Sequence, residues 1–171
     1  MEQPLEAAPL RSIDLNGTWR IAIDPDNTGK SNEWHRNYPL DESRDVPVPG
    51  VVQLAFPDFF GVSWYRTTFR LEGMERNLNY YLRFESIHYF AQIYLNGVHI
   101  GDHEGEMIPF ELSVTQTLKW DGDNELVVRV INPVADRDID GFNLNRMPKA
   151  FHNETNTMSF ISRRERASLI S

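Results

Sequence analysis

Hydrophobic and polar residues alternate with a period of two along most of the chain, and helical periodicity is scarce. Such alternation places one set of side chains on a core and the other set on the opposite face of a β-strand. The enrichment of these segments in β-branched and aromatic residues supports the same interpretation. The segments that we predict to be strands are 18–24, 64–71, 80–85, 89–96 and 125–131.

Turn residues separate these segments at short intervals. Asn96-Gly97 stands between two strand-like segments and predicts a two-residue hairpin in which both residues take positive φ. Residues 121–124 (Asp-Gly-Asp-Asn) predict a turn before the last strand. Two prolines exclude residues 47–50 from a central strand, because proline lacks a backbone N–H, and predict an extended crossing segment. Seven or eight short strands with this spacing predict an all-β sandwich.

The tryptophans divide between the core and other surfaces. Trp19 alternates with isoleucines and is expected in the core. Trp64 and Tyr65 point to opposite faces of one strand, so one of them must leave the main core. That side chain either covers a partner surface or lies under a neighbouring loop. Trp34, Trp64 and Trp120 are the candidates for stacking on a sugar ring.

Composition restricts the class of protein further. The 171 residues fit one domain, and 17 Lys+Arg against 25 Asp+Glu give a net charge of −8. Nucleic-acid binding needs clustered positive charge, so we expect no nucleic-acid partner. The absence of Cys excludes disulfides and thiolate metal sites. We see neither a signal peptide nor an apolar segment of membrane-spanning length, so no membrane partner and, by default, a cytoplasmic location are expected.

Catalytic motifs are not evident among the polar residues. The five histidines have no metal-ligand spacing, and no serine lies in a Gly-x-Ser-x-Gly turn. Glycosidases need two carboxyl groups held roughly 5–10 Å apart, whereas the acids here are scattered over turns and strand exteriors. Asp136, Asp138 and Asp140 alternate, which would align them along an extended loop for hydroxyl recognition or calcium binding; a solvated charged loop is the favoured interpretation. We therefore predict no catalytic residue, metal or cofactor.

The order of short motifs along the chain is more specific than any one of them. The motifs are 15–19 (LNGTW), 46–50 (VPVPG), 61–69 (GVSWYRTTF), 82–89 (LRFESIHY), 93–97 (IYLNG), 101–105 (GDHEG), 109–112 (PFEL) and 122–130 (GDNELVVRV). Over residues 13–149 this series closely resembles the N-terminal sugar-binding domain of glycoside hydrolase family 2, the β-galactosidase, β-glucuronidase and β-mannosidase group.

The resemblance implies a jelly-roll β-sandwich of the galactose-binding-like type at residues 13–149, preceded by an N-terminal arm at 1–12. Family members continue into an immunoglobulin-like domain and a TIM barrel, whose two glutamates catalyse hydrolysis. A barrel needs at least ~200 residues, so this chain cannot contain one and is expected to be inactive alone. The resemblance implies a non-catalytic, carbohydrate-binding accessory domain whose partner is a β-glycoside or a glycosidase catalytic domain. The alternative is a structural domain that packs on the barrel and shapes its rim without binding sugar.

In family members, the loop after the last long strand can reach the rim of the barrel's active site and offer Asp or Asn side chains to the sugar. The matching stretch here is 136–145. The resemblance therefore implies four carbohydrate-binding candidates, which are Asp138, Asp140, Asn143 and Asn145.

The chain departs from the family pattern at two places. Ser113 stands where the family usually has Asp, which removes a turn-fixing hydrogen bond. After Lys149, family members continue into a Ser-Gly-Ile-Trp motif and another sandwich strand, whereas residues 150–171 here are rich in Arg and Ser. We expect no clear strand after Pro133 and an irregular tail at 150–171. The hypothesis that follows is a truncated product or fragment, with one sheet edge left exposed.

Overall fold

The computed structural model describes residues 12–105, 108–147, 159–160 and 164–166. The strands in these residues are β1 (Gly17–Ile23), β2 (Arg44–Val48), β3 (Val62–Phe69), β4 (Asn79–Ser86), β5 (Phe90–Leu95), β6 (Val98–Glu104), β7 (Phe110–Ser113), β8 (Asn124–Ile131), β9 (Ser159–Phe160) and β10 (Arg164–Arg166). Three single-turn 3-10 helices are η1 (Leu40–Glu42), η2 (Val52–Leu54) and η3 (Leu144–Arg146). None of the helical turns in this described part is long and apolar enough to cross a membrane.

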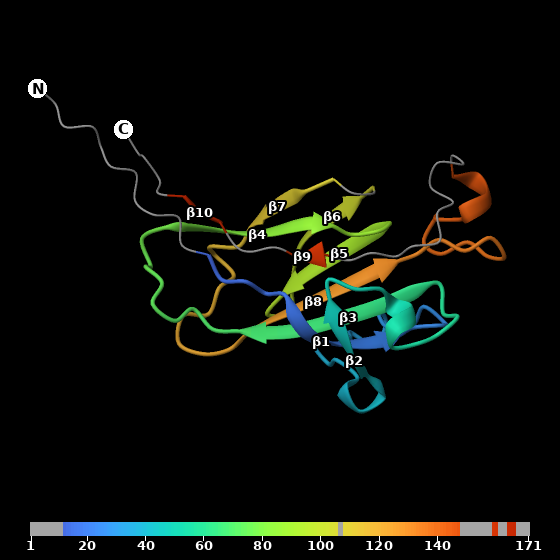
Figure 1. Cartoon of the computed structure of the whole chain (residues 1–171), viewed down its shortest axis with the longest axis horizontal. Coiled ribbons are helices and arrows are strands. Elements are labelled where there is room, and N and C mark those ends of the chain that lie inside the picture. Colours follow the sequence, from blue (N-terminus) through green and yellow to red (C-terminus); the bar gives the residue numbers. More distant parts are fainter. Residues whose placement is uncertain (1–11, 106–107, 148–158, 161–163, 167–171) are drawn as a thin grey trace, which may run out of the picture.

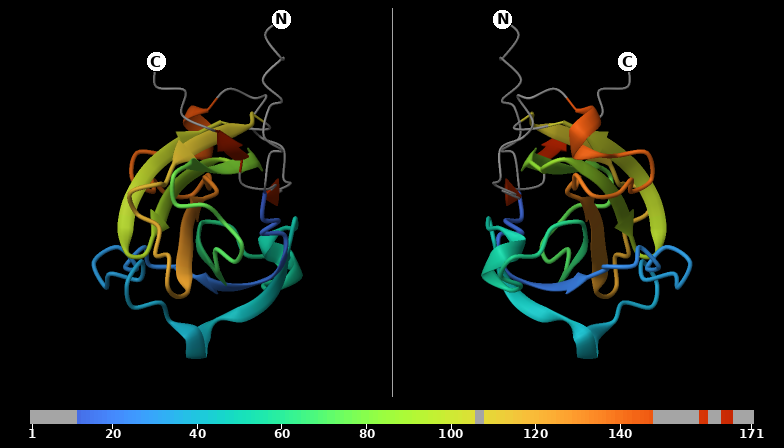
Figure 2. Two further views of the ribbon diagram at one scale, coloured as in Figure 1. Left: turned by 90° about the vertical axis from the view of Figure 1, so that its left-hand side faces the viewer. Right: turned by 90° about the vertical axis from the view of Figure 1, so that its right-hand side faces the viewer.

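The strands pair in two antiparallel sheets that enclose a hydrophobic core (Figure 1). The larger sheet has the order β2-β1-β3-β8-β5-β6, and the smaller has the order β10-β4-β7, with β9 also paired to β4. Viewed from either end, the larger sheet curves around the core beneath β4 and β7 (Figure 2). The all-β sandwich that the sequence predicted is confirmed.

Side chains from the facing surfaces of the two sheets fill the core. Trp19 and Ile21 on β1 and Phe84 on β4 are each at most 1% exposed. Burying one such side chain contributes roughly 1.5–3 kcal/mol. These residues hold alternate positions along their strands, which is why the period-two pattern located β1, β3, β4, β5 and β8 from the sequence.

The central strands β3 and β8 are buried on both faces. Trp64, Val127 and Ile131 point away from the main core, yet at most 1% of each is exposed. They form a second apolar cluster with residues from segments 24–38 and 132–146, which cover this face of the larger sheet. The structure thereby decides between the two alternatives for Trp64. It lies under a neighbouring loop, where its Nε1 donates a hydrogen bond to Asp24 at 3.0 Å.

The prediction of a hairpin turn at Asn96-Gly97 is confirmed. Asn96 and Gly97 have φ values of 54° and 78° and join β5 to β6. Of residues 47–50, which were excluded from a central strand, Pro47 and Val48 end β2 at the edge of the larger sheet, where a missing N–H is tolerated.

The prediction that no strand follows Pro133 is wrong. β9 and β10, although only two and three residues long, both pair with β4 on the side opposite β7. Backbone from the tail therefore covers one edge of β4, whereas our hypothesis left one sheet edge exposed. The other residues of the 150–171 tail, and residues 1–11 of the N-terminal arm, lie outside the described residues, so those domain boundaries stay predictions.

Candidate functional site

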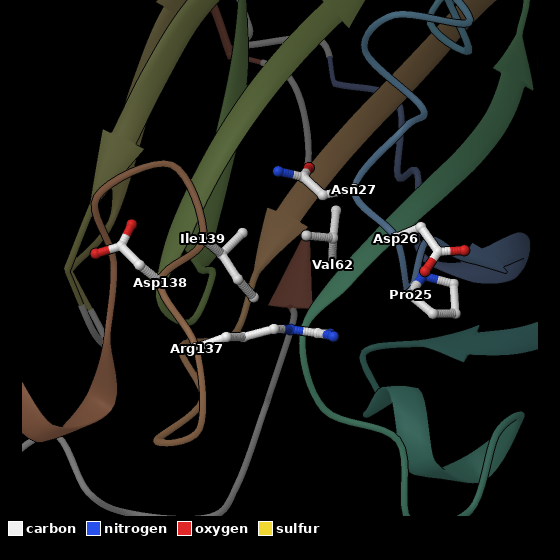
Figure 3. Close-up of a pocket in the computed structure, with 7 residues that line it drawn as sticks. All are labelled: Pro25, Asp26, Asn27, Val62, Arg137, Asp138 and Ile139. Atoms are coloured by element: carbon white, nitrogen blue, oxygen red, sulfur yellow. The ribbon is translucent and has the colours of Figure 1, made fainter.

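A pocket of about 340 Å³ opens between two loops at one end of the larger sheet (Figure 3). The loop after β1 supplies one wall, the loop after β8 supplies the other, and the first residue of β3 lies between them. The lining residues are Pro25, Asp26, Asn27, Val62, Arg137, Asp138 and Ile139. The pocket thus uses the loop in which the sequence placed its four carbohydrate-binding candidates.

The 132–146 loop is folded on itself rather than extended. Ile139 and Phe142 form an isolated antiparallel bridge, and Asp140 between them has a φ of 50°. Asp tolerates this left-handed conformation better than most residues. Because the chain turns here, Asp138 and Asp140 do not line one side of an extended loop, which was the less favoured of the two interpretations of this stretch.

Asp140 directs its carboxylate toward Arg129 and anchors the loop, although a third of its side chain stays exposed. Its Oδ2 accepts a hydrogen bond from Arg129 Nη2 at 2.9 Å, and its Oδ1 accepts one from Asn27 Nδ2 at 3.0 Å. Lys30 Nζ lies 3.6 Å from the same carboxylate. Asp140 therefore ties the 132–146 loop to β8 and to the loop after β1.

Arg129 is the centre of this network and has no exposed side-chain surface. Besides Asp140, its guanidinium donates to Asn27 Oδ1 at 2.6 Å and to Gln92 Oε1 at 2.9 Å. The guanidinium carbon also lies 5.9 Å from the centre of the Trp64 ring. A buried arginine needs such partners, because an uncompensated charge in the interior is strongly destabilising.

Sequence analysis missed the role of Arg129, although a signal was present. The alternating pattern placed this side chain on the outer face of its strand, where solvent was expected. All residues of the segment 126–131 except Arg129 are apolar, which is typical of a strand buried on both faces. A single arginine in such a segment indicates a buried charge with a carboxylate partner elsewhere in the chain.

The electrostatics of Asp140 favour its ionised form. Burial raises the pKa of Asp140, but the hydrogen bond from Asn27 and two nearby positive charges outweigh this effect and hold the pKa below its ordinary value. A general acid needs a raised pKa, so that it carries a proton near neutral pH. Asp140 is therefore suited to anchoring the loop and not to donating a proton.

The other three candidates form hydrogen bonds within the loop. Asp138 accepts from the backbone N–H of Gly141 at 2.7 Å and from Arg146 Nη1 at 3.0 Å. Asn143 and Asn145 bond to backbone groups of the same loop, at distances of 2.8–3.0 Å. Among the four, only Asp138 lines the pocket.

Two pocket residues that the sequence analysis did not single out have side chains that are not engaged by other described residues. Asp26 and Arg137 are exposed, and neither side chain forms a hydrogen bond or ion pair with another described residue. Figure 3 shows the Arg137 side chain extending across the pocket toward Pro25 and Val62. No local pattern marked these two residues, because their significance comes from the meeting of two loops distant in sequence.

Several histidine and tryptophan side chains pack against other aromatic rings. His35 stacks on Tyr94 with ring centres 4.8 Å apart, and His103 stacks on Phe110 at 3.8 Å. Within the described ranges, no group of three or more His, Asp or Glu side chains is arranged to hold a metal ion. Trp34 packs edge-on against the buried Trp64, with ring centres 5.9 Å apart.

The two antiparallel sheets, with a polar pocket between their end loops, place this chain in the class of antiparallel β-sandwich domains. Within that class, the family model "Glycosyl hydrolase 2 galactose-binding domain-like" matches residues 61–165. The chain belongs to this family. The match also extends well past Lys149, so the expectation that the tail does not follow the family is wrong as far as residue 165.

Solved structures with the same fold include bacterial β-glucuronidases. The Ruminococcus gnavus β-glucuronidase is 30% identical with a TM-score of 0.69, and the match covers 78% of this chain and 23% of that one. A β-glucuronidase from an uncultured Clostridium sp. is 28% identical with a TM-score of 0.72, covering 96% and 30%.

Curated relatives show the same partial coverage. The β-glucuronidase of Paenibacillus borealis is 32% identical over 124 residues, which are 70% of this chain and 21% of that protein. The Mus musculus β-glucuronidase is 32% identical over 127 residues, which are 66% and 19%. The chain therefore spans about a fifth of the length of these relatives.

Proposed function

We propose that this chain is a non-catalytic carbohydrate-recognition domain of a family 2 glycosidase, and that it holds part of a β-glycoside in the pocket between its end loops. The proposal rests on one observation: a loop held in place by hydrogen bonds forms one wall of the pocket, and the lining includes polar side chains that bond to no other described residue. The Arg129–Asp140 network fixes the 132–146 loop, while Asp26 and Arg137 present unpaired polar side chains to the pocket. Because the 132–146 loop is already anchored, its backbone needs little further ordering when a hydroxyl-bearing ligand binds in the pocket.

The carboxyl groups around the pocket support a non-catalytic role. Hydrolysis of a glycosidic bond requires two carboxyl groups acting together. Asp140 is bonded to Arg129, and both carboxylate oxygens of Asp138 accept hydrogen bonds from its own loop. Only Asp26 is free among these three acids, so the described part of the pocket offers one unengaged carboxylate where the reaction needs two.

The partner that we propose besides the sugar is a glycosidase catalytic domain lying beside the same pocket. The relatives' greater length supports this part of the proposal. One observation favours the alternative role, in which the domain shapes a rim without binding sugar. Three of the four side chains that the sequence singled out, Asp138, Asn143 and Asn145, form their hydrogen bonds inside the loop.

Isothermal titration separates the two roles. Methyl β-galactoside, methyl β-glucuronide and methyl β-mannoside are titrated separately into the chain, and we expect saturable heat with at least one of them. Asp26→Asn and Arg137→Ala are expected to weaken that binding about tenfold each, the loss of roughly one good hydrogen bond at 1.4 kcal/mol. Asp136→Asn is the matched control, because Asp136 lies in the same loop but does not line the pocket.

Two outcomes would overturn the proposal. Absence of heat with all three glycosides, together with restored activity when the chain is added to a separately produced family 2 catalytic domain, would establish the rim-shaping role. Turnover of a chromogenic glycoside by the purified chain would show that it is catalytic.

A further inference from the structure

A second pocket lies at the opposite end of the sandwich. It has a volume of about 280 Å³ and is lined by Arg70, Leu71, Glu72, Trp120, Asp121 and Gly122. These residues follow the last residue of β3 or precede the first residue of β8, whereas the first pocket contains Val62, where β3 begins. At ~3.3 Å per residue, the eight residues of β3 separate the two pockets by about 25 Å.

Trp120 is held in one orientation at this pocket. Its ring packs against the ring of Tyr80 in an edge-on arrangement, with the centres 5.5 Å apart. The Arg76 guanidinium lies 5.5 Å from the centre of the Trp120 ring and donates to both carboxylate oxygens of Asp121 at 2.9 and 3.0 Å. Trp120 remains partly exposed and lines the pocket with surface that these neighbours leave uncovered.

The backbone that carries Trp120 is also fixed. Asn124 is fully buried, and its side-chain amide bonds to both the N–H and the C=O of Lys119 at 2.7 and 2.8 Å. The side chain of Asn96 donates to Asn124 Oδ1 at 2.9 Å and to the carbonyl of Thr117 at 2.8 Å. The residues flanking Trp120 are thus tied to the β5–β6 hairpin, so the ring is presented without a further ordering cost.

The charges at this pocket favour a neutral ligand. Arg70 is paired with Asp123 at 2.5 Å and Arg76 with Asp121, so both cations are already neutralised. Glu72 forms no hydrogen bond or ion pair with another described residue, which leaves an excess negative charge at the rim. An anionic ligand would be repelled, whereas hydroxyl groups could donate to the free carboxylate.

The lining of this pocket is amphipathic. Leu71 and Trp120 provide apolar surface, and Glu72 and Asp121 provide hydrogen-bond acceptors beside it. A pyranose ring has the complementary character, since its C–H face is apolar and its hydroxyl groups radiate from the edge. Aromatic rings with an apolar face and polar neighbours suit such a ligand.

We propose that this pocket is a second saccharide subsite, in which a neutral sugar ring packs against the exposed part of Trp120 and donates hydroxyl hydrogen bonds to Glu72 and Asp121. It is separate from the pocket of the proposed function and does not depend on it. Because the two pockets lie at opposite ends of β3, one sugar ring cannot occupy both.

Titration of the isotopically labelled full chain with cellotetraose, a neutral oligosaccharide, tests the proposal by NMR. The indole N–H resonance of Trp120 is expected to shift saturably, while those of the buried Trp19 and Trp64 stay in place. Gly122→Leu is the decisive variant. Gly122 lines the pocket, no atom lies within 4 Å of a Cβ added there, and its φ is outside the left-handed region, so a leucine adds bulk at the lining without a clash. It is expected to raise the Kd at least about tenfold.

The controls distinguish binding at this second pocket from binding at the first pocket. Asp26→Asn alters the first pocket and is expected to leave the Trp120 shift unchanged. Tetragalacturonate, an anionic oligosaccharide, is expected to bind at Trp120 more weakly than cellotetraose. An unshifted Trp120 resonance, a shift that persists in a folded Gly122→Leu variant, or equal binding of the anionic probe would each refute the second subsite. None of these results bears on glycoside binding at the first pocket.

Discussion

Arg129 makes hydrogen bonds to three segments of the chain, through Asn27, Gln92 and Asp140, although it has no exposed surface. A cation in this position is tolerated because its neighbours are aligned to receive it. The same contacts hold the two loops that form the first pocket. A single side chain therefore links the stability of the sandwich to the shape of its candidate site.

Replacement of Asp140 tests this link. Asp140→Ala removes the only carboxylate bonded to Arg129 among the described residues, so we expect a loss of roughly 2–4 kcal/mol in the free energy of unfolding. Asp140→Asn keeps an acceptor oxygen and should lose less. Urea denaturation measures both, with Asp136→Ala as the exposed control from the same loop. Equal stability of Asp140→Ala and the control would contradict the anchoring role.

His103 makes stability depend on pH. Burial lowers the pKa of His103 below its ordinary value of 6.5, and its ring stacks on Phe110. The folded state therefore binds a proton less readily than the unfolded state, so stability is full above pH 6.5 and falls as the pH decreases toward the folded pKa. We expect His103→Phe to flatten the dependence of unfolding free energy on pH between roughly 7 and 5. His99→Gln, at an exposed histidine, provides the comparison, and an unchanged slope in His103→Phe would exclude this cause.

At the scale of elements, β4 has partners on both edges. β7 pairs with one edge, and the short strands β9 and β10 pair with the other. Unpaired edge strands expose N–H and C=O groups that recruit other chains. The tail backbone thus protects the smaller sheet, even though its strands are only two and three residues long.

Removal of residues 150–171 is expected to expose this edge. The shortened chain should exchange the amide hydrogens of β4 faster than the full chain does, while β3 in the larger sheet keeps its protection. Hydrogen exchange followed by mass spectrometry reports both strands in one experiment. Size-exclusion chromatography should show more association of the shortened chain, and identical exchange and elution would show that β9 and β10 contribute nothing.

Across the whole molecule, the sequence predicted those parts of the fold that have local signals. The Asn96-Gly97 turn and the alternating strands depend on neighbouring residues, so they could be located directly. β2 contains a proline and β7 has only four residues, so neither gave a strand pattern. The resemblance to family 2 pointed to the loop at the first pocket, but local pattern could not show that Asp140 anchors this loop. That depends on Arg129, a residue on another element.

The hydrogen bonds that hold together the walls of the first pocket join residues that are far apart in the chain. Asn27 and Asp140 are separated by 113 positions, and Asn27 and Arg129 by 102. Bringing such distant segments together before the sheet exists would cost much conformational entropy. The pocket is therefore assembled only when the strands between its walls have closed, and a peptide copied from either loop alone would retain none of it.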